Sequence, residues 1–349
     1  MSNISPDWLT EVLRKHGLLA EARVVEVTAE LIGGEFGFLD CLAGLTLKYD
    51  RAEAAAPASL VVKASSSEAI YRHIGDFYGA YEREFKFYES VAVRSPIRLA
   101  RCWAREFVAS SSTHYLFLED LRSLSPGDQV AGLTPEQARA CIETIGRFHA
   151  AWWQTVELEA LSWMPMRNIR TERFRAAWPK FKEVVGPSLS AAQIALGEQL
   201  NDGFDELLDE IERHPRTIVH SDFRADNLLF DPSSATDPVV VLDWQLAIRG
   251  NPLLDIARLL CGSLRSENRA AVEFELLRRW HEALVAGGVA DYTYRDAQEA
   301  YRQAVLMCLY YPVTIHEAEE AAGRRGTALA HAQISRMFAA AEQLNGFAR

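Results

Sequence analysis

The sequence is poor in the features that mark secreted, metal-stapled and membrane-spanning proteins. Its 349 residues include only five cysteines, an odd number with no CxxC pair. This pattern argues against a disulfide framework and against a structural zinc site. The longest wholly apolar stretch, residues 304–313, is about half of what a membrane-crossing helix needs. The N-terminus lacks the basic start and apolar core of a signal peptide. We expect a reducing, cytoplasmic location.

Positive charge is scarce as well. The chain has 37 Lys and Arg against 48 Asp and Glu, which gives a net charge of −11 at pH 7. This acidic balance provides no electrostatic reason to expect a nucleic-acid partner or an anionic membrane surface. Apolar residues make up 49% and charged residues 24%, values typical of a folded globular chain rather than a collagen-like or disordered one.

The order of β-favouring and amphipathic segments predicts an α+β fold. The first third is rich in predicted strands and holds one amphipathic helix, over residues 76–92, whereas the rest is mostly helical. At about 150 residues per domain, the length allows two domains or one large one. The predicted strands are residues 43–49, 59–63, 113–118, 217–219 and 239–244.

The clearest helix start follows a Ser/Pro/Gly-rich stretch at residues 123–128, which is a candidate linker. Thr134 is a good N-cap, Pro135 suits the first helical position, and Gln137 stands where a capping box requires Glu or Gln. Another helix is predicted over residues 191–213. We therefore expect a small β-rich N-terminal lobe, residues 1–121, and a larger helical lobe, residues 122–349.

The densest run of polar residues is HSDFRADN, residues 220–227, which follows a short predicted strand. A buried apolar run farther along ends in Asp243. Phosphoryl transfer to a hydroxyl needs one carboxylate that accepts the proton, and an amide oxygen and a second carboxylate that hold magnesium. Asp222, Asn227 and Asp243 supply these groups. The alternatives are a polar turn for the first two residues and a strand-end carboxylate for Asp243.

HSDFRADNLLF together with VLDWQ resembles the HxDxxxxN catalytic loop and metal-binding Asp of the aminoglycoside phosphotransferase and choline-kinase-like superfamily. This resemblance implies a bilobal protein-kinase-like fold with ATP and Mg²⁺ as cofactors. The HxDxRxDN variant looks closest to ecdysteroid-kinase-like proteins and to kinase-like domains fused to some acyl-CoA dehydrogenases. The resemblance extends from about Glu26 to Leu260.

The resemblance also implies roles for the residues of this loop. Asp222 would be the catalytic base, and Asn227 and Asp243 would be the magnesium ligands. Arg224 is a further catalytic candidate, because it could meet the γ-phosphate or an anionic acceptor. It could instead simply pair with Asp226.

Two further residues are assigned to the support of the catalytic loop. By the resemblance, His220 would hold the loop and Asp255 would brace it from below. An acidic residue in the first turn of a helix is also favoured by the helix dipole, so Asp255 keeps a second interpretation.

Two charged residues in the first third occupy apolar faces. Lys63 ends an apolar strand, and Glu84 lies in the apolar stripe of the helix predicted over 76–92. Two buried charges can satisfy each other as an ion pair, which would leave Lys63 poised to contact the α- and β-phosphates of ATP. The alternative for Lys63 is a strand-end lysine whose ammonium reaches water.

Other nucleotide contacts have weaker sequence signals. Gly34 and Gly37 precede Lys63 in a glycine-rich segment that could approach phosphate, and a plain hairpin turn explains them equally well. The resemblance assigns adenine contacts to the backbone carbonyl of Glu119 and the backbone N–H of Leu121. No GxxxxGKS or GxxxxGKT phosphate loop is present.

These features favour an ATP- and Mg²⁺-dependent O-phosphotransferase whose acceptor is a small-molecule hydroxyl of an alcohol, phenol, sterol or hydroxyacyl compound. The alternatives are an aminoglycoside O-phosphotransferase and a nucleotide-binding pseudokinase without turnover. The acidic helix face at residues 202–212 would suit a cationic acceptor, and a solvated surface explains it equally well. A metal-dependent hydrolase is disfavoured because the nine histidines form no HxH or HExxH cluster.

Overall fold

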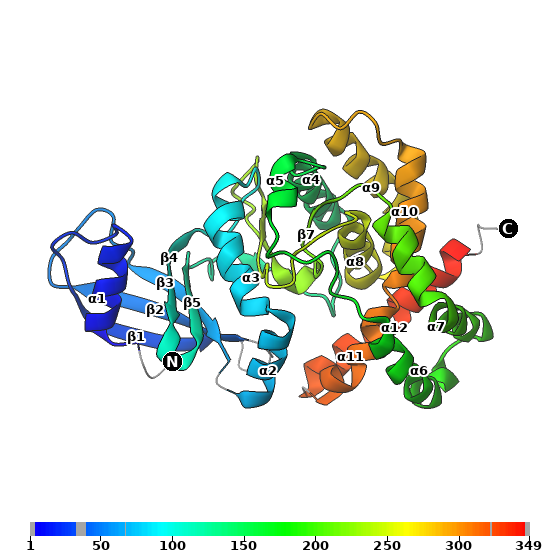
Figure 1. The fold of residues 1–349 in the computed structure, drawn as a ribbon, viewed down its shortest axis with the longest axis horizontal. Helices are drawn as coiled ribbons and strands as arrows, with labels where there is room; N and C mark the ends of the chain where they lie inside the picture. The colour runs from blue at the N-terminus through cyan, green and yellow to red at the C-terminus, as the bar shows by residue number, and fades with distance from the viewer. Residues whose placement is uncertain (1–3, 33–39, 67, 322, 346–349) are drawn as a thin grey trace. The chain divides into compact units, whose positions relative to one another are not determined.

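A computed structural model of the chain describes residues 4–32, 40–66, 68–321 and 323–345 (Figure 1). The chain forms two compact units. Unit 1 comprises Met1–Ser125 and Val241–Gln245, and unit 2 comprises Pro126–Val240 and Leu246–Arg349. The predicted α+β class is confirmed, because unit 1 contains the main β-sheet and unit 2 is largely helical. Within the described ranges, no helix is long and apolar enough to cross a bilayer.

Unit 1 is built on a five-stranded antiparallel sheet in the order β1-β2-β3-β5-β4. In this sheet Lys63 lies on the central strand β3, opposite Leu42 of β2 and Leu116 of β5. The strands are β1 (Val24–Ile32), β2 (Asp40–Tyr49), β3 (Ser59–Ser65), β4 (Cys102–Val108) and β5 (Thr113–Leu118).

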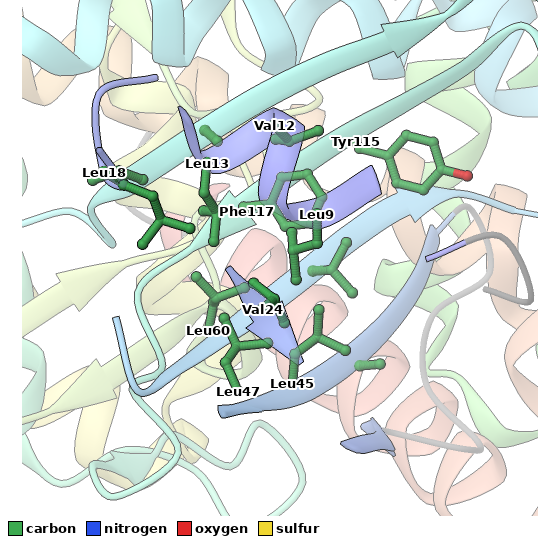
Figure 2. Close-up of a cluster of buried hydrophobic side chains, with 14 of the residues drawn as sticks. Leu9, Val12, Leu13, Leu18, Val24, Leu45, Leu47, Leu60, Tyr115 and Phe117 are labelled. Carbon is green, nitrogen blue, oxygen red and sulfur yellow. The ribbon is translucent and has the colours of Figure 1, made fainter. Parts of the chain in front are cut away.

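Helix α1 (Pro6–Lys15), which the sequence-based prediction lacks, packs on this sheet (Figure 2). Ser5 caps the helix by accepting a hydrogen bond from the N–H of Trp8 at 3.2 Å, and Pro6 suits the first turn. The buried apolar side chains of the helix meet those of the strands in one cluster. Its members include Leu9, Val12, Leu13, Leu18, Val24, Leu45, Leu47, Leu60, Tyr115 and Phe117.

The prediction of one continuous helix over residues 76–92 was wrong. Helix α2 (Ala69–Tyr78) ends at Gly79, whose φ of 63° lies in the left-handed region that glycine adopts without strain. Helix α3 (Ala80–Lys86) starts after it, and the last turn, η1 (Phe87–Val91), is a π-helix. The helical period remained readable because α3 buries Tyr81 and η1 buries Tyr88 and Val91, whereas Phe77 of α2 is exposed. The remaining short helical turns are η2 (Ala92–Arg94) and η3 (Ala109–Ser111).

Helix α8 (Leu253–Ser263) of unit 2 contacts α4, α9, α10 and α12. Ten of its eleven residues are buried. The other helices are α4 (Pro135–Ala151), α5 (Val156–Ala160), α6 (Thr171–Val185), α7 (Ala191–Glu212), α9 (Ser266–Ala286), α10 (Tyr294–Met307), α11 (Tyr310–Ala321) and α12 (Gly323–Asn345). The short elements are η4 (Gly186–Ser188), η5 (Ala225–Asn227), β6 (Ser125–Pro126), β7 (Thr217–Val219), β8 (Leu228–Phe230), β9 (Val239–Val241) and β10 (Ile248–Gly250).

The predicted capping box at the start of α4 is confirmed. Thr134 Oγ1 accepts from the N–H of Gln137 at 3.2 Å, and Gln137 Oε1 accepts from the N–H of Thr134 at 3.0 Å. The predicted helix over residues 191–213 is present as α7, with a second capping box formed by Ser190 and Gln193. These local contacts satisfy backbone donors that no helical hydrogen bond can reach.

A short antiparallel pair positions the polar loop of unit 2. Strand β7 pairs with β10, so that Val219 lies opposite Ile248, and the run HSDFRADN begins at the residue after β7. Shortly after β10 the chain enters α8, which carries Asp255 in its first turn. The β7–β10 pairing therefore brings residues 220–227 and the start of α8 to the same place in unit 2.

Candidate active site

The structure gathers the candidate residues into two groups. In unit 1, Lys63 is surrounded by Asp40, Glu84 and Asp243, which we call the lysine cluster. In unit 2, residues 220–227 are gathered with two residues of α8, and we call this group the loop cluster.

Lys63 Nζ has three carboxylate partners in the lysine cluster. It lies 2.6 Å from Glu84 Oε2, 2.7 Å from Asp243 Oδ1 and 3.2 Å from Asp40 Oδ2. The ion pair with Glu84 that the sequence predicts is therefore present. The alternative, a lysine whose ammonium reaches water, is wrong because only 8% of the Lys63 side chain is exposed.

Burial and charge act in opposite directions on these groups. Burial alone would lower the pKa of Lys63, but the three carboxylates outweigh it and hold this pKa well above its usual value. Burial raises the pKa of Glu84 to about 7 and that of Asp40 to about 6, although Lys63 opposes both shifts. Three carboxylates thus share one ammonium, and acidic groups are in excess in the lysine cluster.

A sharp turn after β9 brings Asp243 into the lysine cluster. The strand predicted to reach residue 244 ends at Val241, and Asp243 has a φ of 65°, a conformation that Asp tolerates better than most residues. The backbone N–H of Trp244 donates to Glu84 Oε1 at 3.2 Å, and its buried ring stacks on Phe87 with centroids 4.3 Å apart. Glu84 therefore holds both the ammonium of Lys63 and the turn that carries Asp243.

Asp222 stands at the centre of the loop cluster, and both of its carboxylate oxygens have partners. Oδ1 accepts from Arg258 Nε at 3.2 Å and from Arg258 Nη2 at 3.1 Å. Oδ2 accepts from Arg224 Nε at 3.0 Å and from Asn227 Nδ2 at 3.1 Å. Burial alone would raise the pKa of Asp222, but the two guanidinium groups outweigh it and bring this pKa below its ordinary value. Asp222 is therefore an ionised and oriented carboxylate at neutral pH.

The other residues of the loop fold around Asp222. Asn227 Nδ2 also donates to the carbonyl oxygen of Asp222 at 2.9 Å. Since the Nδ2 donors are used within the loop, Oδ1 is the atom of this amide with the chemistry of a magnesium ligand. Arg224 Nη1 donates to Asp226 Oδ2 at 3.0 Å and to Gln129 Oε1 at 2.8 Å. The pairing of Arg224 with Asp226 that the sequence left open is thus present, together with its contact to Asp222.

Asp255 supports the loop from the first turn of α8. Its carboxylate accepts from the backbone N–H of His220 at 2.7 Å and from that of Ser221 at 2.8 Å. Fully buried His220 in turn accepts the N–H of Asp222 on Nδ1 at 3.2 Å. Ser221 has a φ of 69°, an unfavourable conformation for a non-glycine residue that these hydrogen bonds hold in place immediately before Asp222.

Arg258 and Tyr311 both contact the loop, and the sequence analysis assigned neither residue to it. The guanidinium of Arg258 lies 4.1 Å from the centre of the Tyr311 ring, and the Tyr311 hydroxyl donates to the carbonyl oxygen of Ser221 at 3.0 Å. A signal was available, since Arg258 stands in the apolar run LLDIARLL and a charged residue on an apolar face needs a partner. Asp40 of the lysine cluster is the first residue of β2 and had no comparable signal.

A profile of the phosphotransferase enzyme family (APH) matches residues 60–299, which is more than half of the chain. The chain belongs to this family. The matched range contains the loop cluster as well as Lys63, Glu84 and Asp243, whereas Asp40 and Tyr311 lie outside it.

Two curated relatives match parts of this chain. Human acyl-CoA dehydrogenase family member 11 is 27% identical over 132 residues, which cover 37% of this chain and 16% of that protein. An uncharacterized kinase-like protein of Caenorhabditis elegans is 24% identical over 190 residues, covering 50% of this chain and 48% of the relative. This phosphotransferase-family chain therefore spans less than half the length of both relatives.

Solved structures show the same fold. Choline kinase from Cryptosporidium parvum superposes with a TM-score of 0.60 at 11% identity, covering 99% of this chain and 97% of that one. An aminoglycoside phosphotransferase in complex with GDP and kanamycin gives a TM-score of 0.57 at 14% identity, covering 98% and 100%. The protein-kinase-like fold expected from the catalytic-loop resemblance is confirmed.

The remaining predicted contacts of this phosphotransferase-family chain concern the nucleotide. The N–H of Glu119 donates to the carbonyl oxygen of Arg101 at 2.7 Å, and Leu121 is buried. The adenine contacts assigned to the carbonyl of Glu119 and the N–H of Leu121 stay predictions. Gly34 and Gly37 lie outside the described residues.

Glu319 of α11 is a buried carboxylate near the loop cluster. Gln333 Nε2 donates to its Oε1 at 2.5 Å, while Oε2 is buried without a hydrogen-bond partner among the described residues. Burial raises the pKa of Glu319 to about 7, although Arg258 and Arg224 oppose the shift and Asp222 adds to it. Because the folded pKa is raised, this carboxylate reduces the stability of the fold progressively as pH rises from about 4.5 to above 7.

We expect Glu319→Gln to stabilise the protein relative to wild type at pH 8 and to have little effect at pH 5. The glutamine keeps an oxygen for Gln333 and cannot ionise, so the gain approaches about 3 kcal/mol at the alkaline end. Denaturant unfolding of both proteins at pH 5, 6, 7 and 8 measures it. Glu320→Gln, at an exposed position of the same helix, is the matched control and should show no comparable rise. A difference that is flat or falls with pH would contradict the assignment.

Proposed function

We propose that this chain transfers the γ-phosphate of ATP to a hydroxyl group of a small molecule, with Mg²⁺ as the metal. The observation that carries the proposal is the state of Asp222, an ionised carboxylate that lies beside Asn227 on a loop braced by Asp255. Membership of the phosphotransferase family and the kinase-like fold support the reaction class.

In this proposal Asp222 accepts the hydrogen of the acceptor hydroxyl. Phosphoryl transfer proceeds through a loose transition state, so catalysis depends mainly on position and on electrostatic stabilisation. A carboxylate whose pKa lies below its ordinary value is a weak base, and it suits the task of orienting a hydroxyl. Arg224, whose side chain is 24% exposed, is the cation of the loop cluster with the most room to move to a phosphate.

The candidate metal ligands carry oxygen donors of the kind that magnesium binds. Asn227 offers an amide oxygen, and Asp243 offers a carboxylate whose side chain is 28% exposed, more than those of Asp40, Glu84 and Lys63. Mg²⁺ prefers oxygen ligands and is commonly held by one or two side chains together with phosphate oxygens. When bound, the ion would neutralise charge on the transferred phosphate. Lys63 would exchange a carboxylate partner for the α- and β-phosphates.

The proposed acceptor is an alcohol, phenol, sterol or hydroxyacyl compound. The names of the relatives and of the structural neighbours include an acyl-CoA dehydrogenase family member, a choline kinase and a kanamycin complex, so they point to no single acceptor. One neighbour is a GDP complex, which makes GTP the second donor to test beside ATP.

The test is a nucleotide-consumption screen with purified protein, ATP or GTP, and a panel of alcohols, phenols, sterols, hydroxyacyl compounds, choline-like amines and aminoglycosides. We expect phosphate transfer to at least one hydroxyl compound and loss of that transfer when magnesium is chelated. Mass spectrometry of the product identifies the phosphorylated hydroxyl. Magnesium-dependent thermal stabilisation by ATP without transfer to any member of the panel would favour a silent nucleotide-binding protein over the proposed enzyme.

A further inference from the structure

We propose that Arg258 is a positioning residue for Asp222, and that α11 and α12 hold Arg258 in the required orientation. Both of these helices follow residue 299, the last residue of the family match. The inference rests on the proposed function of Asp222 and extends it to a part of the chain that the family match does not include.

Helix α8 contacts both the backbone of the loop and the side chain of Asp222. Asp255 and Arg258 are three residues apart and therefore share one face of the helix. Asp255 accepts the backbone N–H groups of residues 220 and 221, while Arg258 donates two N–H groups to Asp222 Oδ1 at 3.2 and 3.1 Å. One rigid helix thus places both the backbone and the carboxylate of the loop.

The two carboxylate oxygens of Asp222 differ in their surroundings. Oδ1 faces Arg258, whose side chain is only 3% exposed, so this contact is shielded from solvent. Oδ2 faces Asn227 and Arg224, and the Arg224 side chain is 24% exposed. A carboxylate anchored on Oδ1 cannot rotate freely about its Cβ–Cγ bond. The geometry therefore assigns Oδ2 as the oxygen that receives the acceptor hydroxyl.

Arg258 is in turn fixed by three side chains from α11 and α12. Its Nη1 donates to Gln333 Oε1 at 2.7 Å, and Gln333 Nε2 donates to Glu319 Oε1 at 2.5 Å. The Tyr311 ring lies against the guanidinium at 4.1 Å, and its hydroxyl donates to the carbonyl oxygen of Ser221. Since Gln333 is fully buried, this chain of contacts leaves the guanidinium plane little freedom.

The chemistry of arginine fits this role. A buried cation is costly unless it is paired, and a well-packed apolar residue would stabilise α8 at least as well. The planar guanidinium reaches Asp222 with two N–H groups and Gln333 with a third, which the single ammonium of lysine cannot reproduce. A small displacement of a catalytic group can cost about 10²-fold in rate.

The experiment compares Arg258→Lys and Arg258→Met with the matched control Arg269→Met. Arg269 of α9 is another buried arginine of unit 2, 2.6 Å from Glu273 Oε1, and among the described residues it forms no hydrogen bond or ion pair with the loop cluster. Each variant is assayed at saturating Mg²⁺ with ATP and an acceptor identified in the screen, or with water as acceptor by ATP hydrolysis. Rates are expressed per folded molecule.

We expect Arg258→Met to lower kcat by about 10²-fold with KM for ATP changed less than about threefold, and Arg258→Lys to recover part of the loss. Arg269→Met should lose stability and retain kcat. In an Asp222→Asn background, Arg258→Met should have no further effect on kcat, because it acts through that carboxylate. If Arg258→Met does not fold, Gln333→Leu provides a milder test, and this variant should also lower kcat.

Equal kcat values for the Arg258 and Arg269 variants would overturn the positioning role and leave the proposed function standing. A full additional loss in the Asp222→Asn background would also overturn it, because Arg258 would then act independently of Asp222. Failure of the proposed function is seen separately, in an Asp222→Asn protein that retains wild-type kcat.

Discussion

Replacement of Asp222 by asparagine should lower the rate of phosphoryl transfer by roughly 10²- to 10⁴-fold and leave nucleotide binding nearly unchanged. The asparagine side chain keeps an oxygen for Arg258 or Arg224 but lacks the negative charge that orients and accepts the hydroxyl proton. Steady-state kinetics with a verified acceptor measure the loss, and thermal stabilisation by Mg²⁺ and ATP measures binding.

The matched control for this variant is Asp226→Asn. Asp226 lies in the same loop, pairs with the same Arg224 at 3.0 Å, and its side chain is 18% exposed, the same fraction as that of Asp222. The control removes an equivalent charge from the same arginine, so it should cost less than about tenfold in rate if only Asp222 meets the acceptor. Comparable activity in both variants would remove Asp222 from its assigned role.

Replacement of Lys63 by methionine should destabilise unit 1 and weaken binding of ATP. Breaking a buried ion pair by removing one partner costs on the order of 3–5 kcal/mol, and Lys63 has three carboxylate partners. Without the ammonium, Asp40 and Glu84 are ionised less readily. The pKa values of about 6 and 7 that they have beside Lys63 should therefore rise further.

The pH dependence of the Lys63→Met effect has a definite sign. Acids whose folded pKa is raised reduce stability as pH increases, so the loss should be larger at pH 8 than at pH 5. Denaturant unfolding at both values measures it. Lys48→Met, at an exposed lysine of neighbouring strand β2, is the control and should change stability little.

A second change tests whether the effect arises in the lysine cluster. Adding Glu84→Gln to Lys63→Met removes one uncompensated carboxylate and keeps an oxygen for the N–H of Trp244, so part of the stability should return. A double variant that is less stable than Lys63→Met at pH 8 would contradict this account.

Much of the fold was readable from local patterns. The capping box at Thr134 and Gln137 marks the start of α4, and alternating or continuous apolar runs mark β2, β3 and β5. The break at Gly79 was missed because the apolar spacing continues through it. Residues 241–245 belong to unit 1, although they follow most of unit 2 in the sequence. No local pattern indicates that this short segment belongs to the first unit.

The candidate site was readable where a residue's chemistry conflicts with its surroundings. Lys63 and Glu84 stand on apolar faces and need each other, and their 2.6 Å ion pair satisfies that need. The same reasoning applied to Arg258 would have indicated a buried partner but not which one. Asp40 could not be found in this way, because a single carboxylate at the start of a strand does not conflict with its sequence neighbours.

By itself the sequence determined the residue types of the candidate site, the order of the elements and the local helix starts, because these depend on neighbours along the chain. Only the tertiary structure decided that three carboxylates share Lys63, and that α8, α11 and α12 hold Asp222 through Arg258. Such partners lie up to 180 residues apart in the chain. Their pairing is set by the packing of helices and strands, which no local pattern encodes.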